Sequence, residues 1–141
     1  MLSLIAPAVI SGLTTGAIYA LVALGLTMIY GVLHIINFAH GSLLMLALYS
    51  VYFANTLLGV DPYVAMPFLM ALFYLFGFLL QRGVINTFSH GKDSNTLLVT
   101  LALAIVIDNL ALYFWTSNTR TIDVPYAFDM VEIFGAYLPI P

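Results

Sequence analysis

The sequence predicts an all-α protein, a polytopic bundle of transmembrane helices with about four spans in a single domain, residues 1–141. Of the 141 residues, 63% are hydrophobic and 6% are charged, whereas soluble domains carry about 25% charged residues. The apolar residues form long runs without the alternation of barrel strands, so helices are the structures that can pair every backbone group in lipid. Residues 1–60 contain no Asp, Glu, Lys or Arg, which is enough chain for two spans of about 20 residues with a surplus.

The composition excludes several functional classes. The chain contains no cysteine and only three Lys or Arg residues, so we expect no disulfide, no thiol chemistry and no basic surface for nucleic acid. The N-terminal apolar run is longer than that of a signal peptide and lacks a basic start, so we expect no cleaved targeting segment. Neither a reactive pair of side chains nor a phosphate-binding loop is visible. We therefore expect a protein that is not an enzyme and that needs no cofactor.

We predict the first span over residues 4–30. Small residues recur along it at intervals of three or four, which places them on one face of a helix. They are Gly12, Gly16, Ala20, Ala23 and Thr27. Such a face lets helices approach closely in lipid, where no hydrophobic drive brings helices together. The stripe therefore predicts helix packing at the centre of a bundle, with lining of a pore as the alternative.

A polar interruption separates the first two spans, and we expect a bent or re-entrant segment at residues 31–41. In this segment Asn37 is placed to cap the second helix, and Gly41 to relieve crowding at the bend. Irregular backbone within the membrane survives where it is buried in protein or lines a water-filled cavity. A tight cytoplasmic turn is the equal alternative. His34 and His40 lie six residues apart, which is not the spacing of a helical metal site, so no metal is expected.

The second and third spans are predicted over residues 42–58 and 63–80, with a break from Gly59 to Pro62. Residues 81–95 are polar and are predicted to form a loop. This loop holds two of the three Lys and Arg residues, so the positive-inside rule places it in the cytoplasm.

The fourth span is predicted over residues 96–115 and contains the only intramembrane acid, Asp108. Polar or small residues recur every four positions along it and predict a polar edge: Thr96, Thr100, Ala104 and Asp108. Intramembrane acids usually face a bundle interior or a cavity. Asp108 therefore has either a structural role, capping or bonding to Asn109 or another helix, or a role in a solute pathway. Residues 116–141 are predicted as an extracytoplasmic loop with a short surface helix near residues 129–137.

Several blocks of sequence carry a family resemblance. They are Gly16-Ala17-Ile18-Tyr19-Ala20-Leu21, Ala23-Leu24-Gly25-Leu26-Thr27 with Tyr30-Gly31, and Ile36-Asn37-Phe38-Ala39-His40-Gly41 with Met45. These blocks resemble the opening of branched-chain amino acid ABC transporter permeases. The stretch from Arg82 through Thr100 to Asn109 is similar to the same family's cytoplasmic loop and following helix. The Asn-Phe-Ala-His-Gly motif is the most specific of these matches.

The resemblance implies a multi-pass permease subunit of the bacterial inner membrane that imports branched-chain amino acids, related amino acids, amides or urea. It also implies three kinds of partner, namely a second permease subunit, cytoplasmic ATPase subunits and an extracytoplasmic solute-binding protein. Family members are considerably longer, so we expect this chain to be an N-terminal portion, either a fragment or a truncated gene product. A membrane scaffold subunit that does not transport is the alternative.

The resemblance also implies where the solute passes. It places one set of motif residues at a signature bend beside the translocation path: Asn37, Phe38, Ala39, His40 and Gly41. Our hypothesis is that these residues contact solute and that Thr100 and Asp108 belong to the same pathway.

Overall fold

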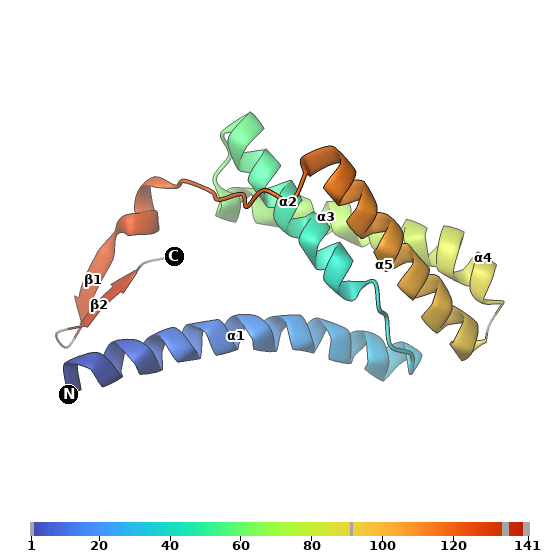
Figure 1. Cartoon of the computed structure of the whole chain (residues 1–141), viewed down its shortest axis with the longest axis horizontal. Helices are drawn as coiled ribbons and strands as arrows, with labels where there is room; N and C mark the ends of the chain where they lie inside the picture. The colour runs from blue at the N-terminus through green and yellow to red at the C-terminus, as the bar shows by residue number, and fades with distance from the viewer. Residues whose placement is uncertain (1, 91, 134–135, 140–141) are drawn as a thin grey trace. The chain divides into compact units, whose positions relative to one another are not determined.

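The computed structural model describes three stretches of the chain, residues 2–90, 92–133 and 136–139. The chain divides into two compact units, one of residues 29–122 and one that combines residues 1–28 with residues 123–141. Figure 1 shows the order of the elements. Within the described residues, four helices are long and apolar enough to cross a membrane. The predicted all-α fold class with about four spans is therefore confirmed.

The first helix, α1 (Leu2–Leu33), contains the first predicted span. It ends at His34, which has a left-handed φ of +56° and donates its backbone N–H to the carbonyl of Tyr30 at 2.8 Å, a common way to close a helix. Thr14 and Thr27 lie inside the helix, and each hydroxyl donates to a backbone carbonyl one turn earlier. Both hydroxyls are thereby paired, as lipid requires. The predicted small-residue stripe lies on α1, and its packing partner stays a prediction.

The helices α2 (His40–Leu58) and α3 (Pro62–Leu80) are joined by the break that the sequence predicts. Gly59 adopts a left-handed φ of +63°, and its N–H donates to carbonyls in the last turn of α2. Asp61 accepts a bond from the backbone N–H of Tyr63 at 2.9 Å, and a proline takes the first helical position. Glycine after a helix, and an aspartate with a proline before the next, are strong stop and start signals.

The polar loop predicted over residues 81–95 is wrong for residues 81–89, because the chain there continues as a helix. A π-helical turn, η1 (Gln81–Ile85), follows α3 directly and leads into α4 (Asn86–Ser89), which ends before His90 at a left-handed φ of +50°. The helical stretch Pro62–Ser89 has 28 residues. At 1.5 Å per residue it extends about 42 Å, beyond a hydrocarbon core of about 30 Å. A helix longer than the hydrocarbon core can continue outside it, so polar side chains do not by themselves mark its end.

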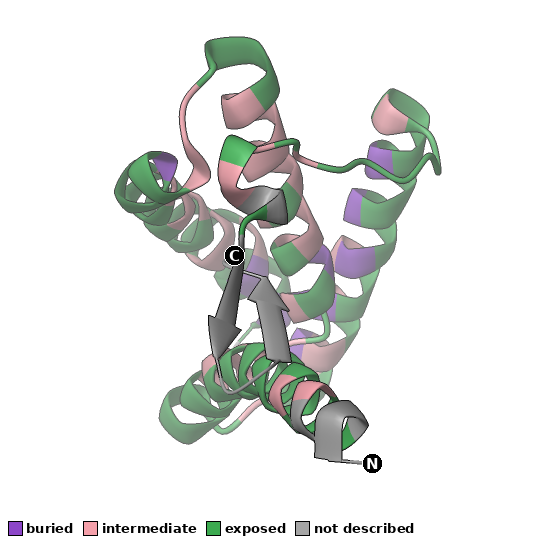
Figure 2. Cartoon of the chain, turned by 90° about the vertical axis from the view of Figure 1, so that its left-hand side faces the viewer, coloured by how far each residue is buried: buried purple, intermediate pink, exposed green. Residues whose placement is uncertain are grey.

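The last long helix, α5 (Asp93–Trp115), packs along α2. The two helices run parallel, because the contacts advance in the same direction along both, from Phe38 with Thr100 to Tyr49 with Trp115. The second and fourth spans therefore point the same way, as alternation through α3 requires. The buried residues of α5 lie along one face (Figure 2) and are Thr96, Thr100, Ala104, Ile107 and Ala111.

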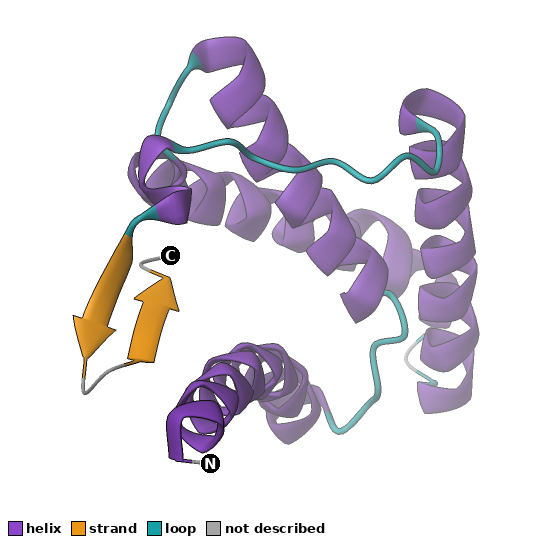
Figure 3. Cartoon of the chain, turned by 60° about the vertical axis from the view of Figure 1, so that its left-hand side comes forward, coloured by secondary structure: helices purple, strands orange, loops and turns teal. Residues whose placement is uncertain are grey.

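Residues 116–139 contain a 3-10 turn, η2 (Pro125–Phe128), and a two-stranded hairpin of β1 (Met130–Ile133) and β2 (Ala136–Pro139), drawn in Figure 3. The strands pair antiparallel, from Met130 with Pro139 to Ile133 with Ala136. The predicted surface helix near residues 129–137 is therefore wrong. The β-branched side chains at alternate positions 131 and 133 favour a strand. Residues 134, 135, 140 and 141 of the predicted loop lie outside the described residues.

Candidate functional site

The segment between α1 and α2 leaves the helical conformation and forms a turn around Asn37. The Asn37 side-chain oxygen accepts a hydrogen bond from the backbone N–H of Ala39 at 3.0 Å, and its carbonyl accepts one from His40 at 3.2 Å. An asparagine that bonds two residues ahead forms an Asx turn. Asn37 therefore starts the turn that leads into α2, whereas Ala39 directly precedes the helix. Asn37, which we predicted to cap α2, therefore lies two residues before the N-cap position, which Ala39 occupies.

This turn lies against α5. The backbone N–H of Phe38 donates to the hydroxyl of Thr100 at 3.4 Å, and that hydroxyl donates to the carbonyl of Leu97 at 3.1 Å. Ala39 is 0% exposed and Thr100 is 1% exposed. The fold thus brings residues of the predicted bend together with the predicted pathway residue Thr100, although 62 positions separate Phe38 from Thr100 in the chain.

Small residues make this close approach possible. Ser42 lies one turn into α2, is buried, and donates its hydroxyl to the carbonyl of Ala104 on α5 at 3.5 Å. A side chain this short reaches the neighbouring backbone only where two helices nearly touch. Ala39 and Ala104 have only methyl side chains, so they leave the space that the contact needs.

A pocket of about 210 Å³ lies beside the turn, within the unit of residues 29–122. We name it the interhelical pocket. Its walls are mainly aliphatic, with Leu33, Leu43 and Leu80 among them, and four polar residues also line it: Asn37, Gln81, Thr96 and Thr100. Sites for drug-sized ligands occupy about 300–1,000 Å³, so this pocket suits a solute of a few heavy atoms. Aliphatic walls with a few hydrogen-bonding groups are the surroundings that a small amphipathic solute requires.

Gly41 and His40 do not line this pocket. His40 is half-exposed on the first turn of α2. A Cβ atom added to Gly41 would meet nothing within 4 Å in the described residues. The expectation that Gly41 relieves crowding is therefore wrong for contacts within this part of the chain.

Asp108 does not belong to the buried edge of α5, so the predicted polar edge is wrong at its last member. Each helical residue turns about 100°, so positions four apart drift by about 40° per step. Asp108 therefore lies about 120° around the helix from Thr96 and is exposed, whereas Ile107 continues the buried face. Nor do the described residues show the predicted bond to Asn109, whose side-chain amide donates to the carbonyl of Ile105 at 2.7 Å.

The other end of the α2–α5 contact is aromatic. The rings of Tyr49 and Trp115 stack with their centroids 4.8 Å apart, and Phe53 lies 5.6 Å from the same indole. Beyond them, a pocket of about 570 Å³ lies between α2 and the chain that follows α5. We name it the aromatic pocket; Tyr52 and Arg120 are among its lining residues.

The sequence analysis missed the aromatic contacts between α2 and the end of α5. One signal in the sequence could have indicated these contacts. The second and fourth spans must run in the same direction, so the end of α5 can lie beside the aromatic residues of α2. Gln81 was also missed as a lining residue of the interhelical pocket. No group of three or more His, Cys, Asp or Glu side chains in the described stretches is placed to hold a metal ion.

Residues 8–140 match the model of a family described as the permease component of branched-chain amino acid transport systems. The chain belongs to this permease family. The predicted resemblance is confirmed, and the match includes both the Asn37 turn and all of α5. Together with the four apolar helices, it makes this chain part of an integral membrane protein.

Curated permeases are similar to the chain over most of its length. It is 30% identical over 121 residues to the high-affinity branched-chain amino acid transport system permease protein BraD of Pseudomonas aeruginosa, covering 80% of this chain and 39% of BraD. It is 29% identical over 134 residues to LivH of Salmonella typhimurium and over 133 residues to LivH of Escherichia coli, permease proteins of the same kind of system, covering 89% of this chain in both cases. These matches cover 43% and 42% of the two LivH proteins.

The chain thus spans about two-fifths of the length of the curated permeases that it matches. No solved structure matches it. Its relatives are named as transport permeases, a class that is not enzymatic.

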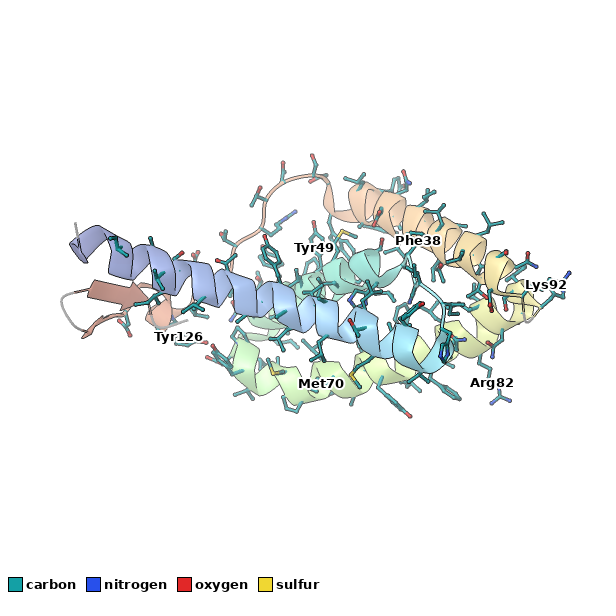
Figure 4. The ribbon with its side chains drawn as sticks, turned by 90° about the horizontal axis from the view of Figure 1, so that it is seen from below. Phe38, Tyr49, Met70, Arg82, Lys92 and Tyr126 are labelled. Atoms are coloured by element: carbon teal, nitrogen blue, oxygen red, sulfur yellow. The ribbon has the colours of Figure 1, made fainter. Side chains whose placement is uncertain are left out.

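Two of the three Lys and Arg residues of the permease chain lie near the first turns of α5, where that helix contacts η1 and α4. Figure 4 places Arg82, in η1, and Lys92, just before α5, at that end of the helix. Arg120 follows the opposite end of α5. The cytoplasmic location of the first pair stays a prediction from the positive-inside rule.

Proposed function

We propose that this chain is part of the membrane permease subunit of an ATP-binding cassette importer that moves branched-chain amino acids across the bacterial inner membrane. The observation that carries the proposal is the family match, which extends over residues 8–140. The chain supplies part of the solute path. A second permease subunit completes the path, cytoplasmic ATPase subunits supply the energy, and an extracytoplasmic solute-binding protein delivers the solute.

Within this function, we assign the turn at residues 37–41 and Thr100 to the solute path. Irregular backbone at membrane depth requires burial in protein or a water-filled cavity, and the turn is partly buried and borders a pocket with four polar lining residues. Ala39 is buried against α5, and Asn37 lines the interhelical pocket together with Thr100. The bond from Phe38 to Thr100 joins the turn to α5, so a movement of either element is transmitted to the other.

Two further groups in the proposed function face parts of the transporter outside this chain. An intramembrane acid requires a bundle interior or a cavity, so we assign Asp108 to a surface that faces the path or a neighbouring helix. We likewise assign the α1 stripe, with Gly12 and Gly16 at its start, to helix packing at the centre of the complete bundle.

The test is uptake by the complete transporter that contains this chain, reconstituted in liposomes with its ATPases and binding protein. We expect ATP-dependent accumulation of labelled leucine, isoleucine or valine that stops when the binding protein is omitted. Accumulation of an amide or urea in place of these amino acids would correct the solute. An intact assembly that hydrolyses ATP and takes up none of these solutes would contradict the proposal and favour a scaffold role.

The role of the turn is tested in the same assay with two histidines. His40→Ala changes a residue of the turn, and His90→Ala is the matched control because His90 lies outside both pockets at the end of α4. We expect the initial rate of uptake to fall for His40→Ala and to stay unchanged for His90→Ala, at equal amounts of assembled transporter. Equal rates for both variants would remove His40 from the path.

A further inference from the structure

The aromatic pocket has a cationic wall and an aliphatic wall. We propose that it binds the carboxylate of an aliphatic amino acid, with the guanidinium of Arg120 as the group that recognises it. The inference rests on the proposed function and adds a binding site for its solute, at the opposite end of α5 from the interhelical pocket. Neither the family match nor the printed names of the relatives assign such a site.

The two walls come from different elements. On one side, α2 contributes Met45 and Leu48, whose side chains are apolar, and Tyr52. On the other, the chain after α5 contributes polar residues, among them Ser117 and Arg120. None of the residues that line the pocket is acidic, so the fixed charge of its lining is positive. An anionic head with an apolar tail matches this distribution of charge and apolar surface.

Arg120 is exposed, contacts both α5 and α2, and retains donors for a ligand. Its Nη2 donates to the carbonyl of Trp115 at 3.3 Å, and its Cζ lies 5.8 Å from the centre of the Tyr52 ring. The first contact uses one of the five N–H donors of a guanidinium, and the second is a cation–π contact that requires no N–H donor. N–H groups at the edge of the guanidinium remain for a carboxylate, which arginine binds through two parallel hydrogen bonds.

The pocket volume of about 570 Å³ lies within the range of small-molecule sites. A branched aliphatic side chain would lie against Met45 and Leu48, and Leu48 is 63% exposed. A lipid phosphate offers the same kind of anionic oxygen atoms. Aromatic residues near a charged residue are also common at the membrane interface, so the experiment must distinguish these two sources.

The probe is a single thiol at the pocket. The chain contains no cysteine, so Ser117→Cys places one reactive thiol of this chain among the lining residues. The complete transporter with this variant is treated with a soluble maleimide in phosphatidylcholine nanodiscs and, separately, in a lipid-free maltoside detergent, with the parent transporter as the blank. The ligands are L-leucine and L-leucinamide, which share a side chain and an amino group and differ in the carboxylate.

We expect L-leucine to slow the labelling of residue 117 and L-leucinamide to leave it unchanged. At about ten times the dissociation constant, labelling should fall about tenfold, because only the unoccupied fraction reacts. Adding Arg120→Gln should raise the leucine concentration needed by at least about tenfold, since it removes a hydrogen bond to a charged group. Arg120→Lys should retain part of the protection. Arg82→Gln also removes one positive charge, but outside this pocket, and the protection of residue 117 by leucine should stay unchanged in this variant.

Equal protection by both ligands, no protection by leucine, or full protection in the Arg120→Gln variant would overturn the proposal. Labelling that is slow in nanodiscs, fast in detergent and insensitive to leucine would identify lipid phosphate as the occupant and would also overturn it. The proposed function is judged separately by uptake. A transporter that accumulates leucine without leucine protection at residue 117 would retain the proposed function and lose this site.

Discussion

The two ends of the α2–α5 contact differ in the size of the residues that form them. At the closed end, Ala39, Ser42, Thr100 and Ala104 bring a backbone segment against α5 and leave little exposed surface. At the open end, Tyr49 and Arg120 line a pocket of about 570 Å³, and the rings of Phe53 and Trp115 contact each other and Tyr49 beside it. Small residues permit contact between backbones, whereas large rings hold two segments apart and leave space between them. One pair of parallel helices can therefore combine a tight joint with an open binding surface.

The largest expected effect comes from enlarging a residue at the closed end. Ala104→Leu places three further carbons where α5 meets Ser42, so we expect a loss of about 1–3 kcal/mol in the free energy of unfolding from overpacking and a loss of uptake. The matched control is Ala102→Leu, on the same helix at an exposed position. Unfolding of the complete permease in detergent and leucine uptake measure both effects. Equal stability of the two variants would show that the closed end is not tightly packed.

The next effect comes from the hydroxyl at the closed end. Thr100→Val keeps the shape of the side chain but removes the acceptor for the N–H of Phe38. A buried donor without a partner costs about 1–3 kcal/mol. The bond to Phe38 is part-buried and 3.4 Å long, so we expect a loss at the lower limit of this range. Thr100→Ser retains the hydroxyl and should lose less stability. A valine variant as stable as the parent would show that the turn is held by packing alone.

We expect the open end to contribute less to the free energy of unfolding than the closed end, and its contribution to come from the stacked rings of Tyr49 and Trp115. A double-mutant cycle with Tyr49→Leu and Trp115→Leu measures the coupling between the stacked rings, which we expect at about 0.5–1.5 kcal/mol. The same cycle on Tyr113 and Trp115 is the control, since no contact between those two rings is found among the described residues. A coupling energy near zero for Tyr49 and Trp115 would show that the rings do not hold the open end together.

The smallest effect concerns the turn before α2. Asn37→Ala removes the side-chain acceptor for the N–H of Ala39 and should cost about 0.5–1 kcal/mol, the usual value for such a bond at a helix start. Asn37→Asp keeps an acceptor and should be close to neutral. Asn109→Ala is a control, because that amide lies inside α5 and bonds to its own helix. If Asn37→Ala and Asn109→Ala have equal effects, the Asx turn contributes nothing specific to stability.

Local signals were sufficient for several elements. The break between α2 and α3 followed from Gly59, Asp61 and Pro62, because each residue restricts the backbone at its own position. The interruption at Asn37 followed from polar residues in an apolar run. The prediction of a loop at residues 81–89 was wrong, because polar side chains indicate contact with water, and a helix can continue into water. The sequence analysis also missed the strand pair β1–β2. Each strand is stabilised by hydrogen bonds to the other, and this pairing is not visible in the local sequence of either strand.

By itself, the sequence determined that this protein is a membrane-embedded helical bundle, where the bend lies and to which permease family the chain belongs. Apolar run length, local turn chemistry and motifs are all read along the chain, so no contact had to be known. Only the tertiary structure decided that Thr100 meets Phe38 and that Ile107, not Asp108, completes the buried face of α5. It also brought Trp115 and Arg120 beside α2. These outcomes depend on which face each helix turns toward its neighbour. In lipid, this orientation is set by the close packing of side chains more than by their hydrophobicity.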